Sequence, residues 1–328
     1  MNKFSYPPFS EKVIKVLKST SKVIIIGHQK PDGDCYNSQL AMGHLMKELG
    51  CKEIILANEG PFEREETKVV EHLFVKKLDE EMLSNNPLLI LVDCGELSRI
   101  GNFEAQVKDL KTVVFDHHPT SLNQGWEYSY IFPASISTTL IIKKLYDALN
   151  IQITPEVASQ LFFGFATDSG FFRFIPPHNG VAVREAADLI ENGANPSHTV
   201  ALMSGGKPFL YLKNTGLLID RTSFVCNGAI ALSYFRLSDE GECPSDNYYS
   251  QIMSVEGVKV VCVFKEIEDK VVLGLRVNYN SNFNVSEFAL TYGGGGHIKA
   301  SGATIKGDFQ EIVDKVTKDI IKAYNKES

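Results

Sequence analysis

Short runs of apolar, mostly β-branched residues recur in the first 150 residues, and stretches with helical spacing separate them. The runs are VIII at 23–26, EIIL at 53–56, LLILV at 88–92 and TVVF at 112–115. This alternation is typical of βαβ units, in which crossover helices join parallel strands. The runs at 88–92 and 112–115 are apolar on both faces, as expected of interior strands covered by helices on each side. We therefore predict an α/β fold with a doubly wound, mainly parallel sheet.

The chain has 328 residues, which is long enough for two domains. Residues 195–208 lose the periodic pattern and contain two prolines and a glycine pair, so we expect a linker there. The linker would separate a first domain over 1–194 from a second over 209–328. In the second we predict a smaller α/β domain, with strands within 222–235 and 258–277 and a closing helix at 309–324.

Charge and cysteine content exclude several classes of protein. The chain has 33 basic and 40 acidic side chains, and its net charge of −7 argues against a broad basic face for long duplex nucleic acid. The six cysteines form no C-x-x-C pair, so a disulfide framework is not expected and a reducing, cytoplasmic location is favoured. No apolar run is long enough to cross a bilayer, and we expect no membrane partner.

Side chains that can bind metal directly follow three of the apolar runs. They are His28, Asp32, Asp34, Asp93, Asp116, His117 and His118. If the strands are parallel, their carboxyl ends share one edge of the sheet, which is where open α/β sheets bind ligands. A further acid, Asp168, ends a helical stretch, where the helix dipole disfavours a carboxylate and a bound cation would compensate. The sequence therefore predicts that these residues converge on a cation site.

Each motif also has an explanation without function. PDGD at 31–34 can form a solvated turn, Asp93 can cap the next helix, and Asp168 can simply end its helix. The pair within DHHP at 116–119 is more informative, because adjacent histidines after an apolar strand are costly to bury without a ligand or hydrogen bonds. Carboxylates and imidazoles without a thiolate suit Mn²⁺ better than Ca²⁺, and they leave Mg²⁺, iron, cobalt and zinc open. The four negative charges of Asp32, Asp34, Asp93 and Asp168 would balance the four positive charges of two divalent ions.

A glycine-rich segment, YGGGGHIKASGA, lies near the C-terminus. The glycines at 293–296 expose backbone N–H groups that can approach a phosphate or a nucleoside, and His297 adds a donor, although a flexible turn is the alternative. No G-K-[ST] follows, so this is not a P-loop. Arg276 is either a surface strand residue or a phosphate clamp. The histidines at 44, 72, 178 and 198 are expected to be packing or surface residues, and Trp126 and the phenylalanines between 162 and 174 are expected to lie in the core.

The ordered motifs HxxPDGD, VDCG, DHHP, TDSGFFRF and GGGGH resemble the DHH phosphoesterase superfamily, in particular its members with a C-terminal DHH-associated domain. Within it, nanoRNases and 3′-phosphoadenosine 5′-phosphate phosphatases match best. The resemblance implies two divalent ions, Mn²⁺ or else Mg²⁺, held by His28, Asp32 and Asp93 on one side and by Asp34, Asp93, His117 and Asp168 on the other. Asp116 would orient its neighbouring imidazole, and His118 would contact the scissile phosphate and assist proton transfer.

The resemblance further implies that Arg276, Gly294, Gly295, Gly296 and His297 grip the substrate. The expected activity is hydrolysis of short oligoribonucleotides to mononucleotides, of 3′-phosphoadenosine 5′-phosphate to AMP and phosphate, or of both. A manganese-dependent inorganic pyrophosphatase, a phosphodiesterase of cyclic or linear dinucleotides and a non-catalytic nucleotide-binding regulator are the alternatives. The partner is thus a short RNA or small nucleotide, and a homodimer is left open. Many relatives have Gly-Ser where this chain has Asn37 and Ser38, which puts substrate preference in question.

Overall fold

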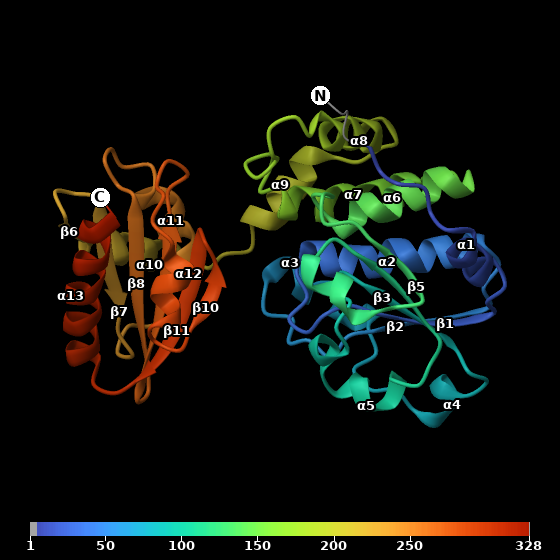
Figure 1. The fold of residues 1–328 in the computed structure, drawn as a ribbon, viewed down its shortest axis with the longest axis horizontal. Coiled ribbons are helices and arrows are strands. Elements are labelled where there is room, and N and C mark those ends of the chain that lie inside the picture. The colour runs from blue at the N-terminus through green and yellow to red at the C-terminus, as the bar shows by residue number, and fades with distance from the viewer. Residues whose placement is uncertain (1–4, 328) are drawn as a thin grey trace. The chain divides into compact units, whose positions relative to one another are not determined.

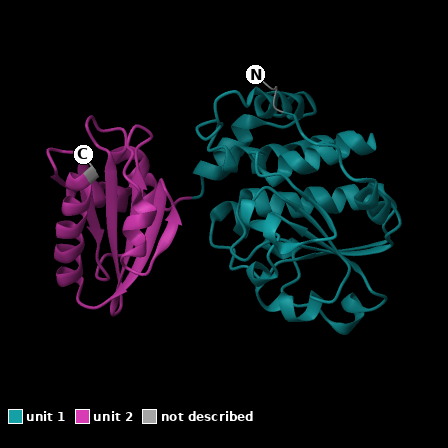
Figure 2. Ribbon diagram, viewed as in Figure 1, with its two compact units in different colours: residues 1–206 teal, residues 207–328 magenta. Residues whose placement is uncertain are grey.

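The computed structural model describes residues 5–327 and divides the chain into two compact units (Figures 1 and 2). Unit 1 comprises residues 1–206 and unit 2 comprises residues 207–328. Among the residues described, no helix is long and apolar enough to span a membrane.

Unit 1 is built on a sheet of five parallel strands in the order β2-β1-β3-β4-β5. The strands are β1 (Lys22–Ile26), β2 (Glu53–Ala57), β3 (Leu88–Val92), β4 (Thr112–Asp116) and β5 (Tyr128–Ile131). The sheet confirms the predicted α/β class. Because β2 and β3 lie on opposite sides of β1, the direction of winding changes between β1 and β3, and a crevice at the carboxyl ends of these two strands is the expected ligand site.

Helices cover both faces of this sheet (Figure 1). On one face Ile25 and Ile90 pack with residues of α2 (Gly33–Glu48), α6 (Thr138–Leu149) and α7 (Pro155–Asp168), and α1 (Glu11–Lys18) and α8 (Gly180–Glu191) complete this core. On the other face Ile24 and Leu89 pack against Phe103 and against Val107 of α5 (Glu104–Val107). Alternate strand residues therefore enter two separate cores, which explains why the central strands are apolar on both faces.

The shorter helical segments of unit 1 connect these layers. They are α3 (Glu65–Lys68), α4 (Glu80–Leu83) and α9 (Pro196–Ser204), with the 3₁₀ segments η1 (Glu71–Leu73), η2 (Leu97–Phe103) and η3 (Pro119–Gln124).

The segment expected as a linker, 195–208, is largely helical. Asn195 accepts a hydrogen bond from the N–H of His198, and Pro196 is the first residue of α9, which contacts α3 and α7. The Asn-Pro pair that indicates a loop is here an N-cap and a first helical turn. The two units part between Gly206 and Lys207.

Unit 2 contains a mixed sheet of six strands in the order β10-β11-β9-β8-β7-β6. The β7–β8 pair is parallel and the other pairs are antiparallel. Its elements are α10 (Phe209–Asp220), β6 (Ser223–Val225), β7 (Ile230–Phe235), α11 (Ser245–Ile252), β8 (Val260–Ile267), β9 (Lys270–Val277), α12 (Val285–Leu290), β10 (Gly295–His297), β11 (Ala300–Lys306) and α13 (Phe309–Glu327). A smaller second α/β domain was predicted, and the strands β8 and β9 within 258–277 and the closing helix α13 form as expected.

Candidate metal centre

The fold brings the acids and imidazoles that follow the strands to one edge of the sheet in unit 1. His28 lies two residues after β1, and Asp93 follows β3 directly. Asp116 is the last residue of β4, which lies beside β3, and His117 and His118 come next. Because all these strands are parallel, their carboxyl ends meet, and side chains far apart in the sequence become neighbours.

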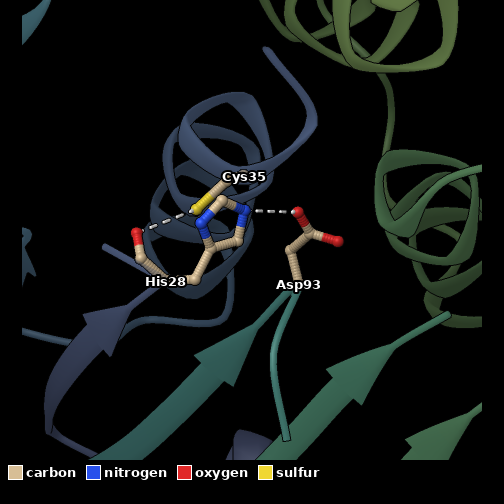
Figure 3. A group of neighbouring side chains, drawn as sticks. All are labelled: His28, Cys35 and Asp93. Carbon is tan, nitrogen blue, oxygen red and sulfur yellow. Dashed lines mark hydrogen bonds and ion pairs between the residues drawn. The ribbon is translucent and has the colours of Figure 1, made fainter. Parts of the chain in front are cut away.

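Asp93 lies at the centre of this group and is 2% exposed. Its Oδ2 is 3.4 Å from Nε2 of His28, and its Oδ1 is 3.5 Å from Nε2 of His117 (Figure 3 shows the His28 side). Burial alone would raise the pKa of Asp93, but the hydrogen bond from His28 and the charges of the imidazoles outweigh it and hold the pKa below its usual range. Asp93 therefore stays ionised, with Oδ2 toward His28 and Oδ1 toward His117.

Asp34 is fully buried in the first turn of α2 and accepts hydrogen bonds from the start of α6. The backbone N–H of Thr138 donates at 2.6 Å, and the N–H and hydroxyl of Thr139 donate at 2.9 and 2.7 Å. The carboxylate thus sits at a helix N-terminus, where the helix dipole favours a negative charge. Burial and the nearby charge of Asp93 nevertheless raise the pKa of Asp34 well above its ordinary value.

Two glycines allow α2 and α7 to approach closely enough to join Asp34 to the group. A Cβ at Gly164 would lie 2.7 Å from Oδ1 of Asp34, and a Cβ at Gly33 would lie 2.4 Å from the side chain of Thr167. Asp168, the last residue of α7, then lies with Oδ2 3.3 Å from Nε2 of His117. Burial and the charges of the other aspartates raise its pKa well above the usual value.

The donor set fits divalent cations. Three groups of side chains each place one ligand atom per residue within 4.8 Å of the others, and these groups are His28, Cys35 and Asp93; Asp93, His117 and His118; and Asp34, His117 and Asp168. The raised pKa values of Asp34 and Asp168 arise from burial and mutual repulsion, which positive charge between the carboxylates would relieve. Oxygen and imidazole donors suit Mn²⁺ and Mg²⁺.

Asp32 and Cys35 lie beside His28. Asp32 is the N-cap of α2, because its Oδ1 accepts a hydrogen bond of 3.1 Å from the N–H of Cys35, and the same oxygen is 3.8 Å from Nε2 of His28. Cys35, which was not predicted as a site residue, lies near His28 and Asp93, and its Sγ is 3.8 Å from the carbonyl oxygen of His28 (Figure 3). Burial raises the pKa of this thiol, so it is a neutral donor there.

Asp116 and His118 form a hydrogen-bonded pair next to the acids. Nδ1 of His118 donates to Oδ1 of the fully buried Asp116 at 2.8 Å, and the hydroxyl of Ser121 donates to Oδ2. Burial lowers the pKa of His118. The hydrogen bond to Asp116 and the charge of Asp93 together raise this pKa by more than burial lowers it, so the pKa of His118 is above its usual value. This arrangement fixes the ring and favours the protonated form.

The residues expected to hold substrate lie on neighbouring strands of unit 2. Ala300 of β11 pairs with Arg276 of β9 on one side and with His297 of β10 on the other. The guanidinium of Arg276 lies 4.8 Å from the ring centre of Tyr249. Gly294 packs against backbone, since a Cβ there would lie 2.1 Å from the carbonyl oxygen of Gly302. Gly294 thus allows the segment before β10 to approach β11 closely.

The unusual Asn37 does not reach the acids. It is buried, and its Nδ2 donates to the carbonyl of Gly33 at 2.8 Å, so it stabilises the first turn of α2. Thr138, Thr139 and Ser121 were missed by sequence reasoning. The signal for the threonines was a polar SISTT stretch at the expected start of a helix, which identifies a cap but not the carboxylate it meets.

Comparison with known proteins agrees with the motifs. The model of the DHH family N-terminal domain matches residues 22–165, and the DHHA1 domain model matches residues 239–323. The chain is 28% identical to the bifunctional oligoribonuclease and PAP phosphatase NrnA of Thermus thermophilus, over 97% of both chains. It is 27% identical to the protein of the same name from Mycoplasma genitalium, over 94% of this chain and 97% of that protein.

A solved structure shares the fold. The crystal structure of an exopolyphosphatase-related protein from Bacteroides fragilis superposes with a TM-score of 0.83 at 19% identity, over 96% of this chain and 95% of that chain. The matches to the two domain models confirm the predicted DHH and DHHA1 domains. The chain therefore has a DHH family N-terminal domain within unit 1 and a DHHA1 domain within unit 2.

Proposed function

We propose that the protein is a metal-dependent phosphoesterase that hydrolyses short oligoribonucleotides to mononucleotides and 3′-phosphoadenosine 5′-phosphate to AMP and phosphate. The observation that carries this proposal is the convergence of three carboxylates, two of them buried, and three imidazoles at one sheet edge, in a chain that also has a DHHA1 domain. The relatives named for both activities match nearly the full length of the chain, which supports this substrate class. The six free cysteines fit a reducing compartment, and we place the enzyme in the cytoplasm.

In this proposal two divalent ions, Mn²⁺ by preference and Mg²⁺ as the alternative, share Asp93. The proposed ligand sets are His28, Asp32 and Asp93 for one ion, and Asp34, Asp93, His117 and Asp168 for the other. The support is that the two oxygens of Asp93 lie toward different histidines, as a bridging carboxylate requires. Bound divalent ions supply positive charge that polarises a phosphate and lowers the pKa of water.

His118 is proposed to assist proton transfer. Its Nδ1–H is engaged by Asp116, so Nε2 is the nitrogen available to a substrate. As water attacks phosphorus, the ester P–O bond breaks and the departing oxygen takes up a proton, which His118 can deliver. Asp116 and Ser121 hold the ring in place and stabilise its protonated form.

The DHHA1 domain is proposed to bind the remainder of the substrate. Arg276 can pair with a phosphate, and Gly294, Gly295, Gly296 and His297 offer donors along a neighbouring strand. The strand register supports this role, because β11 alone separates Arg276 from His297.

The test is a hydrolysis panel with the metal-free protein. Oligoribonucleotides of two to five residues, 3′-phosphoadenosine 5′-phosphate, a cyclic dinucleotide and pyrophosphate are incubated with added Mn²⁺ or Mg²⁺, and the products are separated by chromatography. We expect release of mononucleotides and of AMP, with faster turnover in Mn²⁺. Rapid cleavage of pyrophosphate alone, or binding without hydrolysis of any compound, would contradict the proposal.

A further inference from the structure

A hollow of about 510 Å³ opens beside Asp168 in unit 1. Residues 133–136, which join β5 to α6, form one wall, and residues 174 and 176–179, which join α7 to α8, form another. The wall formed by residues 133–136 also contacts the candidate metal centre, because Nδ1 of His117 donates to the carbonyl of Ser135 at 3.4 Å. The hollow is therefore continuous with the candidate metal centre through Asp168 and Ser135.

The lining of the hollow is mostly apolar. Its apolar members are Pro133, Ala134, Ile136, Phe174, Pro176 and Pro177. No lysine or arginine occurs among the lining residues described, so the hollow is unsuited to a second phosphate group. Its volume lies within the range of small-molecule sites, which are typically apolar with a few polar groups. These properties suit an uncharged, largely flat ligand group.

Most polar side chains of the lining are already engaged within the protein. The hydroxyl of Ser135 donates to the carbonyl of Ser137 at 2.8 Å. Asn179 accepts from the N–H of Ala182 at 3.4 Å and donates to the carbonyl of Ala134 at 3.5 Å. Apart from Asp168, the remaining polar residue of the described lining is the exposed His178. The hollow thus offers few hydrogen-bonding groups that could distinguish one flat ligand from another by the donors and acceptors along its edge.

Phe174 is 68% exposed, although sequence reasoning assigned it to the core. The chain reverses between Asp168 and Phe174 through three residues with positive φ, namely Gly170 (54°), Phe171 (50°) and Phe172 (73°). The Phe172 ring packs edge-on against Phe165 at 5.6 Å. Phenylalanine rarely adopts this backbone conformation, and strained positions of this kind concentrate at functional sites. The turn leaves Phe174 exposed at the hollow.

We propose that this hollow is the nucleoside subsite of the enzyme, in which the base of the nucleotide whose phosphate reacts stacks on Phe174. This inference rests on the proposed function and narrows its substrates to phosphate esters that carry a base. Stacking on an aromatic ring accepts every base, because each has a flat face. With little edge recognition available, the enzyme is expected to hydrolyse substrates that differ only in their base at similar rates.

The first test compares two substrates that differ only in the base. They are 3′-phosphoadenosine 5′-phosphate and the corresponding 1′-deoxyribose bisphosphate, which lacks the adenine. The wild type should prefer the nucleotide, and Phe174→Ala should lower the ratio of the two kcat/KM values by about 5- to 150-fold, the range known for loss of one stacked base. Phe224→Ala, which removes a 48% exposed phenylalanine from β6, should leave the ratio at the wild-type value.

The second test measures binding without turnover. The chain has one tryptophan, Trp126, so the double variant Phe174→Trp, Trp126→Phe carries a single indole at the hollow. Titration with AMP should quench its fluorescence, and titration with ribose 5-phosphate should not.

The outcomes separate this inference from the proposed function. If the wild type hydrolyses both bisphosphates with equal kcat/KM, or if Phe174→Ala leaves the ratio unchanged, the nucleoside subsite is wrong and the phosphoesterase activity stands. If the wild type hydrolyses neither compound, the 3′-phosphoadenosine 5′-phosphate phosphatase part of the proposed function fails, and quenching by AMP still decides whether the hollow binds a base. Equal quenching by AMP and by ribose 5-phosphate would overturn the stacking on Phe174.

Discussion

The hydroxyl of Thr138 donates a hydrogen bond of 2.9 Å to Asp93. The backbone N–H of the same threonine donates to Asp34 at 2.6 Å, so one residue at the start of α6 holds carboxylates that follow β1 and β3. The first turn of α6 thereby fixes the spacing of two proposed metal ligands. This arrangement makes α6 part of the metal centre, although none of its residues is a proposed ligand.

Thr138→Val keeps the shape and the backbone N–H but removes the hydroxyl bonded to Asp93. We expect metal affinity or turnover to fall by about 10- to 100-fold, as is usual when a group that orients a metal ligand is lost. Calorimetric titration with Mn²⁺ and a turnover assay measure the two effects. Thr20→Val, which removes a hydroxyl bonded to Val16 at the end of α1, is the matched control and should change neither. Wild-type metal affinity and turnover in Thr138→Val would contradict this role.

Gly164→Ala should damage the metal centre by steric displacement. The added Cβ would lie 2.4 Å from Cγ2 of Thr139 and 2.7 Å from Oδ1 of Asp34, so the carboxylate must move. We expect loss of Mn²⁺ binding at the site that includes Asp34, together with a drop in turnover. Gly216→Ala in α10 meets no atom within 4 Å and should be neutral or slightly stabilising. Equal metal affinity in the two variants would argue against tight packing at residue 164.

Asp93→Ala should abolish hydrolysis, with turnover reduced by more than about 10³-fold, because Asp93 is proposed to serve both ions. The Mn²⁺ content of the purified variant, measured by elemental analysis, should fall for both sites rather than for one. Full turnover in an Asp93→Ala protein that is shown to bind metal would mean that Asp93 is not a metal ligand.

Asp116→Asn should lower kcat while leaving metal binding largely intact. The amide cannot stabilise the protonated ring of His118 as the carboxylate does, and general acid catalysis typically contributes about 10²- to 10⁴-fold. Single-turnover kinetics at saturating substrate measures this step. His118→Asn should give a loss of similar size, and the double variant should be no worse than the single ones. Additive losses would show that the two residues act independently.

Lys143 stabilises unit 1 away from the metal centre. Its side chain is 5% exposed, and its Nζ lies 2.6 Å from Glu185, 2.5 Å from Asp188 and 3.0 Å from Asp147. Burial lowers the pKa of Lys143, but these carboxylates raise it more, so its folded-state pKa is above the ordinary value. Its contribution to stability is therefore complete at neutral pH and is lost only as alkaline pH passes the raised pKa.

Lys143→Met should lower the free energy of unfolding by about 2 kcal/mol at neutral pH, because it leaves Glu185 poorly paired. Thermal unfolding followed by circular dichroism measures the change. Lys144→Met, at a neighbouring side chain that is 25% exposed and shares two of the same partners, should cost less. A larger loss for Lys144→Met would contradict the importance of burial at Lys143.

The sequence allowed the parallel sheet to be predicted because its central strands are buried on both faces and are therefore apolar throughout. β5 was not expected, since YSYI at 128–131 lacks such a run. The convergence of the acids and imidazoles was foreseeable from the residues that follow β1, β3 and β4, because strand direction alone places them at one edge of the sheet. The roles of Thr138 and Thr139 were not, because they depend on how α6 crosses the start of α2.

Aromatic residues illustrate the same limit. Phe162, Phe165 and Phe174 are chemically alike, and sequence reasoning placed all of them in the core. The first two are buried, whereas Phe174 is exposed because the left-handed turn before it redirects the chain. Because phenylalanine seldom adopts a positive φ, nothing in the sequence indicates that Phe171 and Phe172 do so, and the exposure of Phe174 could not be predicted.

The proposed ligands span most of unit 1, from His28 after β1 to Asp168 at the end of α7. A chain emerging from the ribosome therefore cannot assemble the complete centre until α7 has left the exit tunnel. In the proposed two-metal centre, the second cation can therefore bind only after this half of the protein has been synthesised, so the nascent chain would lack the proposed activity until then.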